Sequence, residues 1–327
     1  MEEQEQLFEQ RTDLSGLQNA VERLKSEIGK VIVGQDQMIE LLLAGLLADG
    51  HILIEGVPGV AKTLTAKLLS RAVSTGFSRI QFTPDLMPSD VTGTSVFNPK
   101  ETVFQFRQGP IFSNIVLIDE INRAPAKTQA ALFEVMEERQ VTVDGETYPL
   151  QQPFMVVATQ NPIEQEGTYH LPEAQLDRFL FKINVTYPNH EEELKVLLHH
   201  HKSNLENMVY EVQSVLSVDE LKALREKVYG VHVEEKLLSF ITSIVGTTRN
   251  NKNIYLGASP RASIGIMKGS KALAAMRGRD FVTPDDIIFI APAVLRHRIV
   301  LTPEKEMEGS SSDAVIDQLI HSIEVPR

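Results

Sequence analysis

The chain has 327 residues, of which 42% are hydrophobic, and this is enough for one large or two medium-sized globular domains with a substantial core. Its formal net charge is -12, with 44 acidic against 32 basic residues, which excludes a chain-wide basic field of the kind that attracts nucleic acid or an anionic membrane. There is no cysteine, so disulfides, thiolate metal sites and thiol redox chemistry are excluded as well.

The first ten residues, MEEQEQLFEQ, are acidic and do not follow the basic-then-apolar pattern of a signal peptide. The longest apolar run, at about 41–48, is too short to span a bilayer. We therefore expect a cytoplasmic protein with no membrane insertion and no nucleic-acid partner.

Helical and strand patterns alternate over the first part of the chain. A helix is expected within 13–30, and after the segment VIVGQDQ a second apolar helix should end at Asp49 and Gly50. The first helix is predicted from apolar residues at intervals of three and four: Leu17, Val21, Leu24 and Ile28. Strands are predicted at short apolar runs without alternation, which are typical of a parallel sheet buried on both faces: 51–54, 115–118, 154–158 and 180–185.

Two stretches are predicted to be insertions in this α/β pattern. The first is a loop-rich region at about 83–110 that contains VFQFR. The second, at about 139–150, reads RQVTVDGETYPL, and its Asp144-Gly145 pair between alternating residues indicates a tight hairpin.

The character of the sequence changes after Tyr187 and Pro188. Nearly every later segment has a helical pattern with clear start signals. We therefore predict an α/β domain at 10–187 and a smaller all-helical domain at 188–327. The start signals are the capping box Ser217-x-x-Glu220, the pair Ser259-Pro260 and the segment Thr283-Pro284-Asp285-Asp286.

A phosphate-binding loop is predicted between the first strand and the next helix. The segment GVPGVAKT begins at Gly56 and ends at Thr63. Gly56 and Gly59 allow backbone amides to turn toward phosphate oxygens, Lys62 reaches the terminal phosphates, and the Thr63 hydroxyl can bind magnesium. The alternative is a glycine-bearing turn that binds no ligand.

The position before the lysine of this loop is Ala61, where the general pattern has glycine. If its φ is negative and the methyl group points away from the phosphates, nothing is lost. If glycine's special conformation is required there, alanine costs energy.

Two adjacent carboxylates follow the buried strand IVLI. Asp119 suits magnesium, directly or through water, and Glu120 suits a general base that activates water. Adjacent acids beside the core are costly without a cation or proton to meet them. An acidic helix N-cap would explain one carboxylate but not both.

Four segments together resemble the MoxR family of AAA+ ATPases: GVPGVAKT, LIDEINRAPAKTQAALFEVMEE, ATQNPIEQEGTYHLPEAQLDRF and GASPRAS. The resemblance covers about 10–325. It implies a P-loop core with a parallel five-stranded sheet between helices, followed by a C-terminal helical lid. It also implies ATP and magnesium as cofactors, and in this family alanine at the position of Ala61 is usual.

The resemblance assigns three further residues to catalysis, in addition to Lys62 and Glu120. Asn161 matches a sensor that orients water or contacts the γ-phosphate, although it could be a simple Asn-Pro turn residue. Arg178, expected in a helix that runs from Pro172, matches the arginine finger offered in trans to a neighbouring subunit. Its alternative is a surface cation balancing a helix C-terminus. Arg261 matches the second sensor, and a cation at a helix N-terminus is favourable only beside an anion.

The resemblance also completes the expected ligand set. The segment VGQ at 33–35 should pack on adenine, with a structural linker as its alternative. Arg107 and Arg123 are further candidate interface cations. The two insertions match elements that line the central pore of related rings, with a pair of solvated loops as the alternative. The expected magnesium ligands are Thr63 and Asp119. The expected nucleotide-binding residues are Val33, Gly34, Gln35, Gly56, Val57, Pro58, Gly59, Val60, Ala61, Lys62, Thr63, Leu64 and Arg261.

The leading functional hypothesis is an ATPase that assembles into a ring, expected to be hexameric, and remodels or activates a partner protein. The resemblance suggests a partner with a von Willebrand factor A-type domain. One alternative is a nucleotide-gated scaffold with little turnover. Another is a nucleic-acid motor, which the acidic balance disfavours. A small-molecule kinase is the weakest alternative, because it gives the Asp119-Glu120 pair and the helical domain no role.

Overall fold

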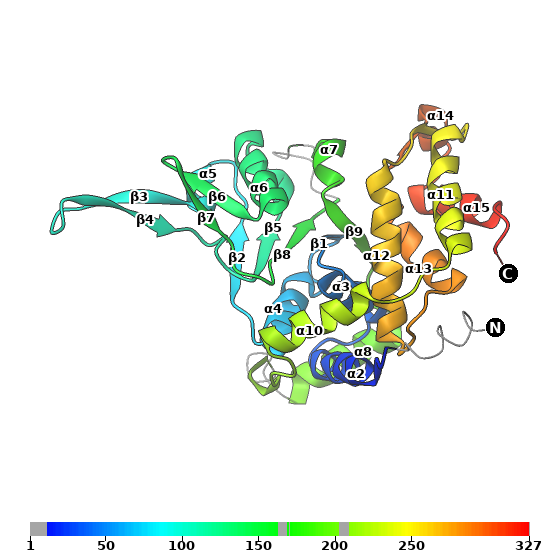
Figure 1. Cartoon of the computed structure of the whole chain (residues 1–327), viewed down its shortest axis with the longest axis horizontal. Coiled ribbons are helices and arrows are strands. Elements are labelled where there is room, and N and C mark those ends of the chain that lie inside the picture. Colours follow the sequence, from blue (N-terminus) through cyan, green and yellow to red (C-terminus); the bar gives the residue numbers. More distant parts are fainter. Residues whose placement is uncertain (1–11, 163–168, 170, 203–208, 327) are drawn as a thin grey trace, which may run out of the picture.

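The protein is built around one parallel β-sheet (Figure 1). The computed structural model describes residues 12–162, 169, 171–202 and 209–326. The strand order is β2-β5-β8-β1-β9 and every neighbouring pair is parallel, which confirms the expected five-stranded sheet. The strands are β1 (His51–Gly56), β2 (Phe77–Gln81), β5 (Ile115–Asp119), β8 (Met155–Gln160) and β9 (Phe179–Val185).

Strand β2 is the one member of the sheet that the apolar runs did not predict. Its sequence, FSRIQ, contains one fully buried side chain, Ile80, because β2 lies at the edge of the sheet. An edge strand needs little apolar surface, so a search for continuous apolar runs passes over it.

The sheet separates two hydrophobic clusters. Side chains alternate along each strand, so Ile52 and Ile54 enter one cluster while Leu53 enters the other. Both faces are therefore buried, which is why the predicted strands are apolar throughout. The first face is covered by α2 (Ser15–Gly29), α3 (Asp36–Leu47) and α4 (Lys62–Ala72), and the second by α6 (Ala126–Glu138).

The second half of the chain is mainly helical, as expected, with one small antiparallel pair, β10 (Ile254–Leu256) and β11 (Val300–Leu301). Its longer helices α11, α12 and α13 stand beside the sheet at the β9 edge (Figure 1). The helices are α8 (His190–Lys202), α10 (Val218–Tyr229), α11 (Glu235–Asn250), α12 (Pro260–Met276), α13 (Pro284–Leu295), α14 (Pro303–Met307) and α15 (Ser312–His321).

The three predicted start signals lie at helix starts. The Ser217 hydroxyl accepts from the Glu220 amide at 3.2 Å, and the Glu220 carboxylate accepts from the Ser217 amide at 2.7 Å. Ser259 caps α12, and Thr283 forms the capping box of α13. The sequence therefore located three helix starts correctly.

The helical half packs directly on the sheet and on the N-terminal helices. A side chain at Gly269 of α12 would approach Ile290 and Phe181 to 2.7 and 2.8 Å, so the absence of a side chain allows α12 to lie close to α13 and β9. One hydrophobic cluster runs from α2 and α3 through α10, α12 and α13 to α15. Within the residues that the structure describes, no separate core therefore marks a boundary at 188, and the division into two domains stays a prediction.

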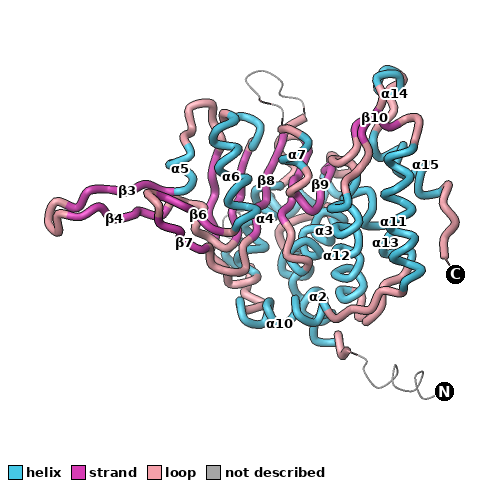
Figure 2. The backbone as a smooth tube through the Cα atoms, turned by 45° about the horizontal axis from the view of Figure 1, so that its top comes forward, coloured by secondary structure: helices cyan, strands magenta, loops and turns pink. Residues whose placement is uncertain are grey.

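Both predicted insertions contain β-hairpins. The first follows α5 (Pro88–Thr92) and projects far from the sheet, and Figure 2 shows the second beside its base. The rings of Phe106 and Tyr148 stack with centroids 4.3 Å apart, and the Ser95 hydroxyl donates to Asp144 at 2.5 Å. The two hairpins are therefore fastened together. They are formed by β3 (Gly93–Asn98) with β4 (Val103–Gln108), and by β6 (Gln140–Val143) with β7 (Glu146–Pro149).

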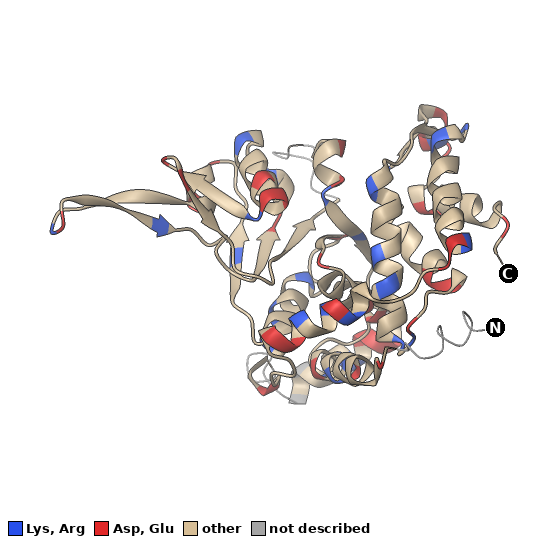
Figure 3. Ribbon diagram, viewed as in Figure 1, with Lys and Arg blue, Asp and Glu red and all other residues tan. Residues whose placement is uncertain are grey.

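Charged residues of both signs are mixed over the surface of the protein. Figure 3 shows Lys and Arg interspersed with Asp and Glu over both halves of the described chain. Among the described residues, no helix is long and apolar enough to cross a membrane.

Candidate active site

A cavity of about 750 Å³ opens where β1, β5 and β8 end, at the carboxyl edge of the sheet. Ligands of open α/β sheets bind at this edge, and the volume suits a small organic molecule. The lining residues come from seven separate segments of the chain and include Val31, Ile32, Val33, Gln35, Pro58, Gly59, Val60, Ala61, Lys62, Thr63, Leu64, Arg79, Gln81, Asp119, Glu120, Thr159, Asn161, Tyr187, Pro188, Glu193 and Val196.

The predicted phosphate loop connects β1 to α4 along one wall of this cavity. Gly59 has a φ of 88°, a conformation that glycine adopts without strain. Lys62 is the first residue of α4, and its ammonium group donates to the carbonyl of Gly56. The start of α4 thus faces the cavity and offers its dipole to an anion. Gly56 and Val57 are not among the lining residues that the structure describes.

Ala61 adopts the conformation that glycine favours. Its φ is 60° and its ψ is 19°, in the left-handed region. That conformation costs an L-residue about 1–2 kcal/mol. The half-buried Ala61 methyl packs against the hydrophobic cluster that includes α4, which offsets part of this cost.

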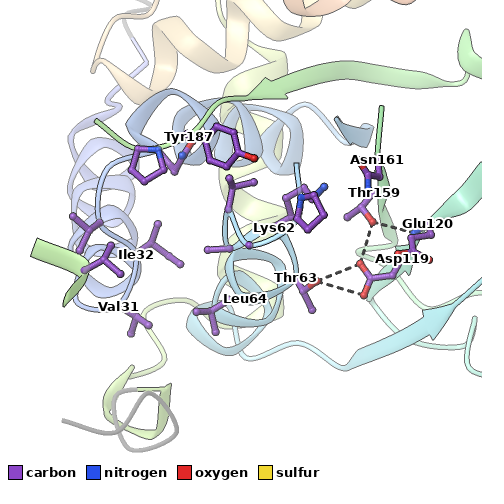
Figure 4. Close-up of a pocket in the computed structure, with 18 of the residues that line it drawn as sticks. Val31, Ile32, Lys62, Thr63, Leu64, Asp119, Glu120, Thr159, Asn161 and Tyr187 are labelled. Carbon is purple, nitrogen blue, oxygen red and sulfur yellow. Dashed lines mark hydrogen bonds between the residues drawn. The ribbon is translucent and has the colours of Figure 1, made fainter. Parts of the chain in front are cut away.

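Asp119 lies at the opposite wall and is 5% exposed. Its carboxylate accepts from the Thr159 hydroxyl at 3.0 Å and from the Thr63 hydroxyl at 3.3 Å (Figure 4). Magnesium prefers such carboxylate and hydroxyl oxygens. The two predicted metal ligands therefore converge from β5 and α4, and their donor set fits this ion.

Glu120 follows Asp119 and has a left-handed φ of 57°. Its carboxylate accepts from the Gln81 amide at 2.9 Å and lies 2.9 Å from the Arg123 guanidinium. Its backbone amide donates to the Thr159 hydroxyl at 3.1 Å. A strained backbone held by several contacts is common at functional sites, and here it places a second carboxylate beside the first.

Asn161 comes directly after β8, as predicted, and is 8% exposed. Figure 4 shows it beside Thr159, on the same side of the cavity as Asp119. Part of the motif that follows it, 163–168 and 170, lies outside the described residues.

The other end of the cavity is apolar. Val31, Ile32 and Tyr187 lie there, away from Asp119 (Figure 4). The amide of Gln35 donates to the carbonyl of Thr186 at 3.1 Å, which ties this segment to the end of β9. The cavity is thus apolar at one end, cationic at the loop and acidic at the far end, an arrangement that matches the base, phosphates and metal of a nucleotide. Gly34, predicted to contact the nucleotide, is not among the described lining residues.

Arg178 and Arg261 lie away from this cavity, in a second cleft of about 280 Å³. The helix expected to carry Arg178 is shorter than predicted: α7 (Glu173–Leu176) ends two residues earlier, and Arg178 lies in the turn before β9. Arg261 is at the start of α12, as predicted. Both guanidiniums contact Glu137, at 3.6 Å from Arg178 and 2.9 Å from Arg261. The described lining of the nucleotide-shaped cavity includes neither arginine.

Sequence reasoning missed three polar residues around Asp119 and Glu120. Arg79 and Gln81 of β2 contact the two carboxylates, and the Thr159 hydroxyl links Asp119 to the Glu120 amide. The available signal was the alternation in FSRIQ, which places Arg79 and Gln81 on one face of a strand.

A phosphate loop after β1, an Asp-Glu pair at the end of β5 and this strand order, in which β8 lies between β1 and β5, define an AAA+ type P-loop nucleotide-binding core. Two family models match the chain: the ATPase family associated with various cellular activities over 51–181, and the AAA lid domain over 246–319. Chaperone MoxR1 of Mycobacterium tuberculosis is 45% identical, with 94% of this chain and 83% of that protein covered. The chain belongs to the MoxR family of AAA+ ATPases.

Two further comparisons agree with that assignment. YeaC of Bacillus subtilis is 48% identical, with 91% of this chain and 92% of that protein covered. A crystal structure of a candidate ATPase from Cytophaga hutchinsonii has a TM-score of 0.87 and 44% identity, covering 95% of this chain and 96% of that one. The fold and the family are therefore shown by independent similarities.

Proposed function

We propose that this protein hydrolyses ATP to ADP and phosphate in a magnesium-dependent reaction and uses the cycle to remodel a partner protein. The convergence of Thr63 and Asp119 beside the phosphate loop, with Glu120 next to them, carries the proposal. Family membership supports the same reading.

Each group in the cavity has a chemical task in this proposal. Magnesium, held by Thr63 and Asp119, would neutralise charge on the phosphates. Lys62 and the amides of its loop bind the phosphate oxygens. Glu120 accepts the proton of the attacking water, and Asn161 orients that water. In-line attack then needs little covalent participation by the protein, because positioning and electrostatics supply most of the rate.

Arg178 and Arg261 would act on the nucleotide of a neighbouring subunit. The second cleft holds both arginines away from the cavity of their own chain, which supports a role in trans for each. A finger supplied in trans accounts for about 10³- to 10⁵-fold in rate in related phosphate chemistry. We propose a ring, hexameric by family resemblance, in which each cavity is completed by the next chain.

The client is proposed from resemblance and from the name of one relative. MoxR1 is described as a chaperone, and the family resemblance suggests a partner with a von Willebrand factor A-type domain. The fastened hairpins project away from the sheet, and in a ring they would move with the core (Figure 2). Hydrolysis would then change the shape of the surface that the client meets.

A second candidate function is a nucleotide-gated scaffold with negligible turnover. It is favoured by the contacts of Glu120, whose carboxylate is paired with Arg123 and Gln81. These contacts occupy the Glu120 carboxylate, which must leave them before it can accept a proton from water. A scaffold of this kind would bind nucleotide but would not hydrolyse it at a significant rate.

The deciding experiment compares wild type with Glu120→Gln at protein concentrations where the chains assemble. Hydrolysis should fall by about 10²- to 10⁴-fold while binding of an ATP analogue is retained, because the amide cannot accept the proton. Glu134→Gln, at an exposed position of α6, is the matched control. Equal turnover in wild type and Glu120→Gln would refute the assigned base, and equally negligible turnover in both would favour the scaffold.

A further inference from the structure

Strand β2 brings an additional cation to the acidic end of the cavity. The Nε of Arg79 lies 2.6 Å from Oδ2 of Asp119, and Arg79 is among the lining residues. Arg79 pairs in register with Leu117, so its side chain reaches diagonally along β5 to the carboxylate two residues further on. The proposed binding of phosphates by the loop does not require this contact, and neither do the proposed roles of Arg178 and Arg261 in trans.

The hydrogen bonds of Asp119 show which donor can be exchanged. Oδ1 accepts from Thr159 at 3.0 Å and from Thr63 at 3.3 Å, while Oδ2 accepts from Arg79 at 2.6 Å and from Thr63 at 3.4 Å. Thr159 is 3% exposed and fixed inside the sheet, whereas the side chain of Arg79 is 54% exposed. Arg79 is therefore the charged donor that can move away from Asp119 into solvent.

Simultaneous binding of a guanidinium and a magnesium ion to this carboxylate is energetically unfavourable. Both are cations, and at contact distances in a partly buried site their repulsion is strong. Asp119 needs a cation beside it, because a carboxylate with so little exposure is costly when unpaired. One of the two cations must balance it at any time.

We propose that Arg79 is a positioning residue that competes with magnesium for Asp119 and thereby sets the magnesium concentration at which nucleotide binds. The inference rests on the proposed function, because it takes Asp119 as the metal ligand. Arg79 balances the carboxylate until magnesium arrives with the nucleotide, and then swings toward solvent. Gln81 lies within 3.4 Å of the Arg79 guanidinium and also donates to Glu120. A movement of Arg79 therefore changes the contacts of both Asp119 and Glu120.

The test is the magnesium dependence of binding of a fluorescent, non-hydrolysable ATP analogue. In Arg79→Gln the half-saturating magnesium concentration should fall by about three- to tenfold, because the competing charge is gone. Arg79→Lys, which keeps the charge, should stay near wild type. Lys67→Gln, at an exposed position of α4, is the control for the change in net charge.

A second readout is the thermal midpoint measured in EDTA. Arg79→Gln should lower it more than Lys67→Gln does, because Asp119 loses its balancing cation. Arg79→Thr provides a second neutral variant with good strand propensity if glutamine folds poorly at this edge position.

The outcomes separate the two proposals. If wild type fails to bind the analogue at any magnesium concentration, the proposed function fails. If wild type binds but both neutral variants leave the magnesium midpoint unchanged or raise it, the competition proposal is overturned while the ATPase proposal stands.

Discussion

Glu137 of α6 accepts a hydrogen bond from Arg261 of α12, with 2.9 Å between Oε1 and Nη2. Its other oxygen, Oε2, lies 3.6 Å from Nη1 of Arg178. Arg178 also donates to the carbonyl of Phe133, one turn earlier on α6. A single carboxylate therefore fixes the spacing of two guanidiniums that come from the two halves of the chain. It also reduces their mutual repulsion.

Removing this carboxylate should impair hydrolysis without weakening nucleotide binding. In Glu137→Ala the two arginines lose their common anchor, and misplacement of such groups by about 1 Å can cost about 100-fold in rate. We expect kcat of the assembled protein to fall by about ten- to 100-fold. The affinity for an ATP analogue should change by less than about threefold, because Glu137 lies in the second cleft.

The control for this variant is Glu138→Ala, at the next exposed position of α6. Glu137→Gln should retain part of the activity, since its amide oxygen can still accept from Arg261. A wild-type kcat in Glu137→Ala would show that the shared carboxylate has no part in positioning the arginines.

The conformation of Ala61 gives a second prediction. Ala61→Gly relieves the left-handed strain but loses the packed methyl group and increases the entropy of the unfolded chain. These effects oppose one another, so nucleotide affinity should change by less than about threefold and the free energy of unfolding by less than about 1 kcal/mol.

Ala61→Val supplies the contrast at the same position. A β-branched residue is strongly disfavoured at positive φ, so this variant should lose several-fold in nucleotide affinity. Equilibrium binding of a fluorescent nucleotide measures both variants. A large gain in nucleotide affinity for Ala61→Gly would show that alanine at this position weakens nucleotide binding and would contradict the prediction.

Much of the fold and part of the site could be predicted from the sequence, for identifiable reasons. The apolar runs that form β1 and β5 were recognised because both strands are buried on both faces. The phosphate loop was recognised because its glycines and lysine come directly after a strand. Asp119 was found because it ends such a strand, whereas the role of Asn161 was assigned by the resemblance to the family. Strand β2 was missed because Ile80 is its single buried side chain, and Arg79 and Gln81 were missed with it.

The arginines illustrate a different limit. Resemblance to the family supplied roles for Arg178 and Arg261, but the cleft in which each lies depends on how α12 packs against the core. Glu137 carried no signal of its own, because an exposed glutamate near a helix end is common. Its role follows from the structure, in which Arg178 and Arg261, distant in the sequence, both contact its carboxylate.

The stability of the protein should depend on pH through His51. This buried side chain accepts from the Val156 amide at Nδ1, and its Nε2 lies 3.1 Å from the carbonyl of Met136. Burial, which disfavours the charged ring, lowers the pKa of His51 from 6.5 to about 4. Between these values the unfolded chain binds a proton that the folded chain does not, so stability falls as the pH falls from 6.5 toward 4.

The loss expected from His51 alone is about 1.6 kcal/mol between pH 6.5 and pH 5. Urea unfolding at several pH values measures it. His51→Asn should be less stable than wild type at neutral pH but should show a shallower decline toward pH 5. His321→Asn, at an exposed position of α15, should keep the wild-type slope. Parallel slopes for wild type and His51→Asn would rule out His51 as the source of the acid sensitivity.

The central claim is that two chains share each site, and the most direct test is the ATPase rate per subunit as a function of protein concentration. The same rate is measured for wild type mixed with increasing Arg178→Ala. We predict that the rate per subunit rises with concentration and that the variant lowers activity more than dilution does, because each variant chain disables its neighbour. A rate per subunit that stays flat, with mixtures that behave as simple dilution, would show that each chain works alone and would contradict the ring mechanism.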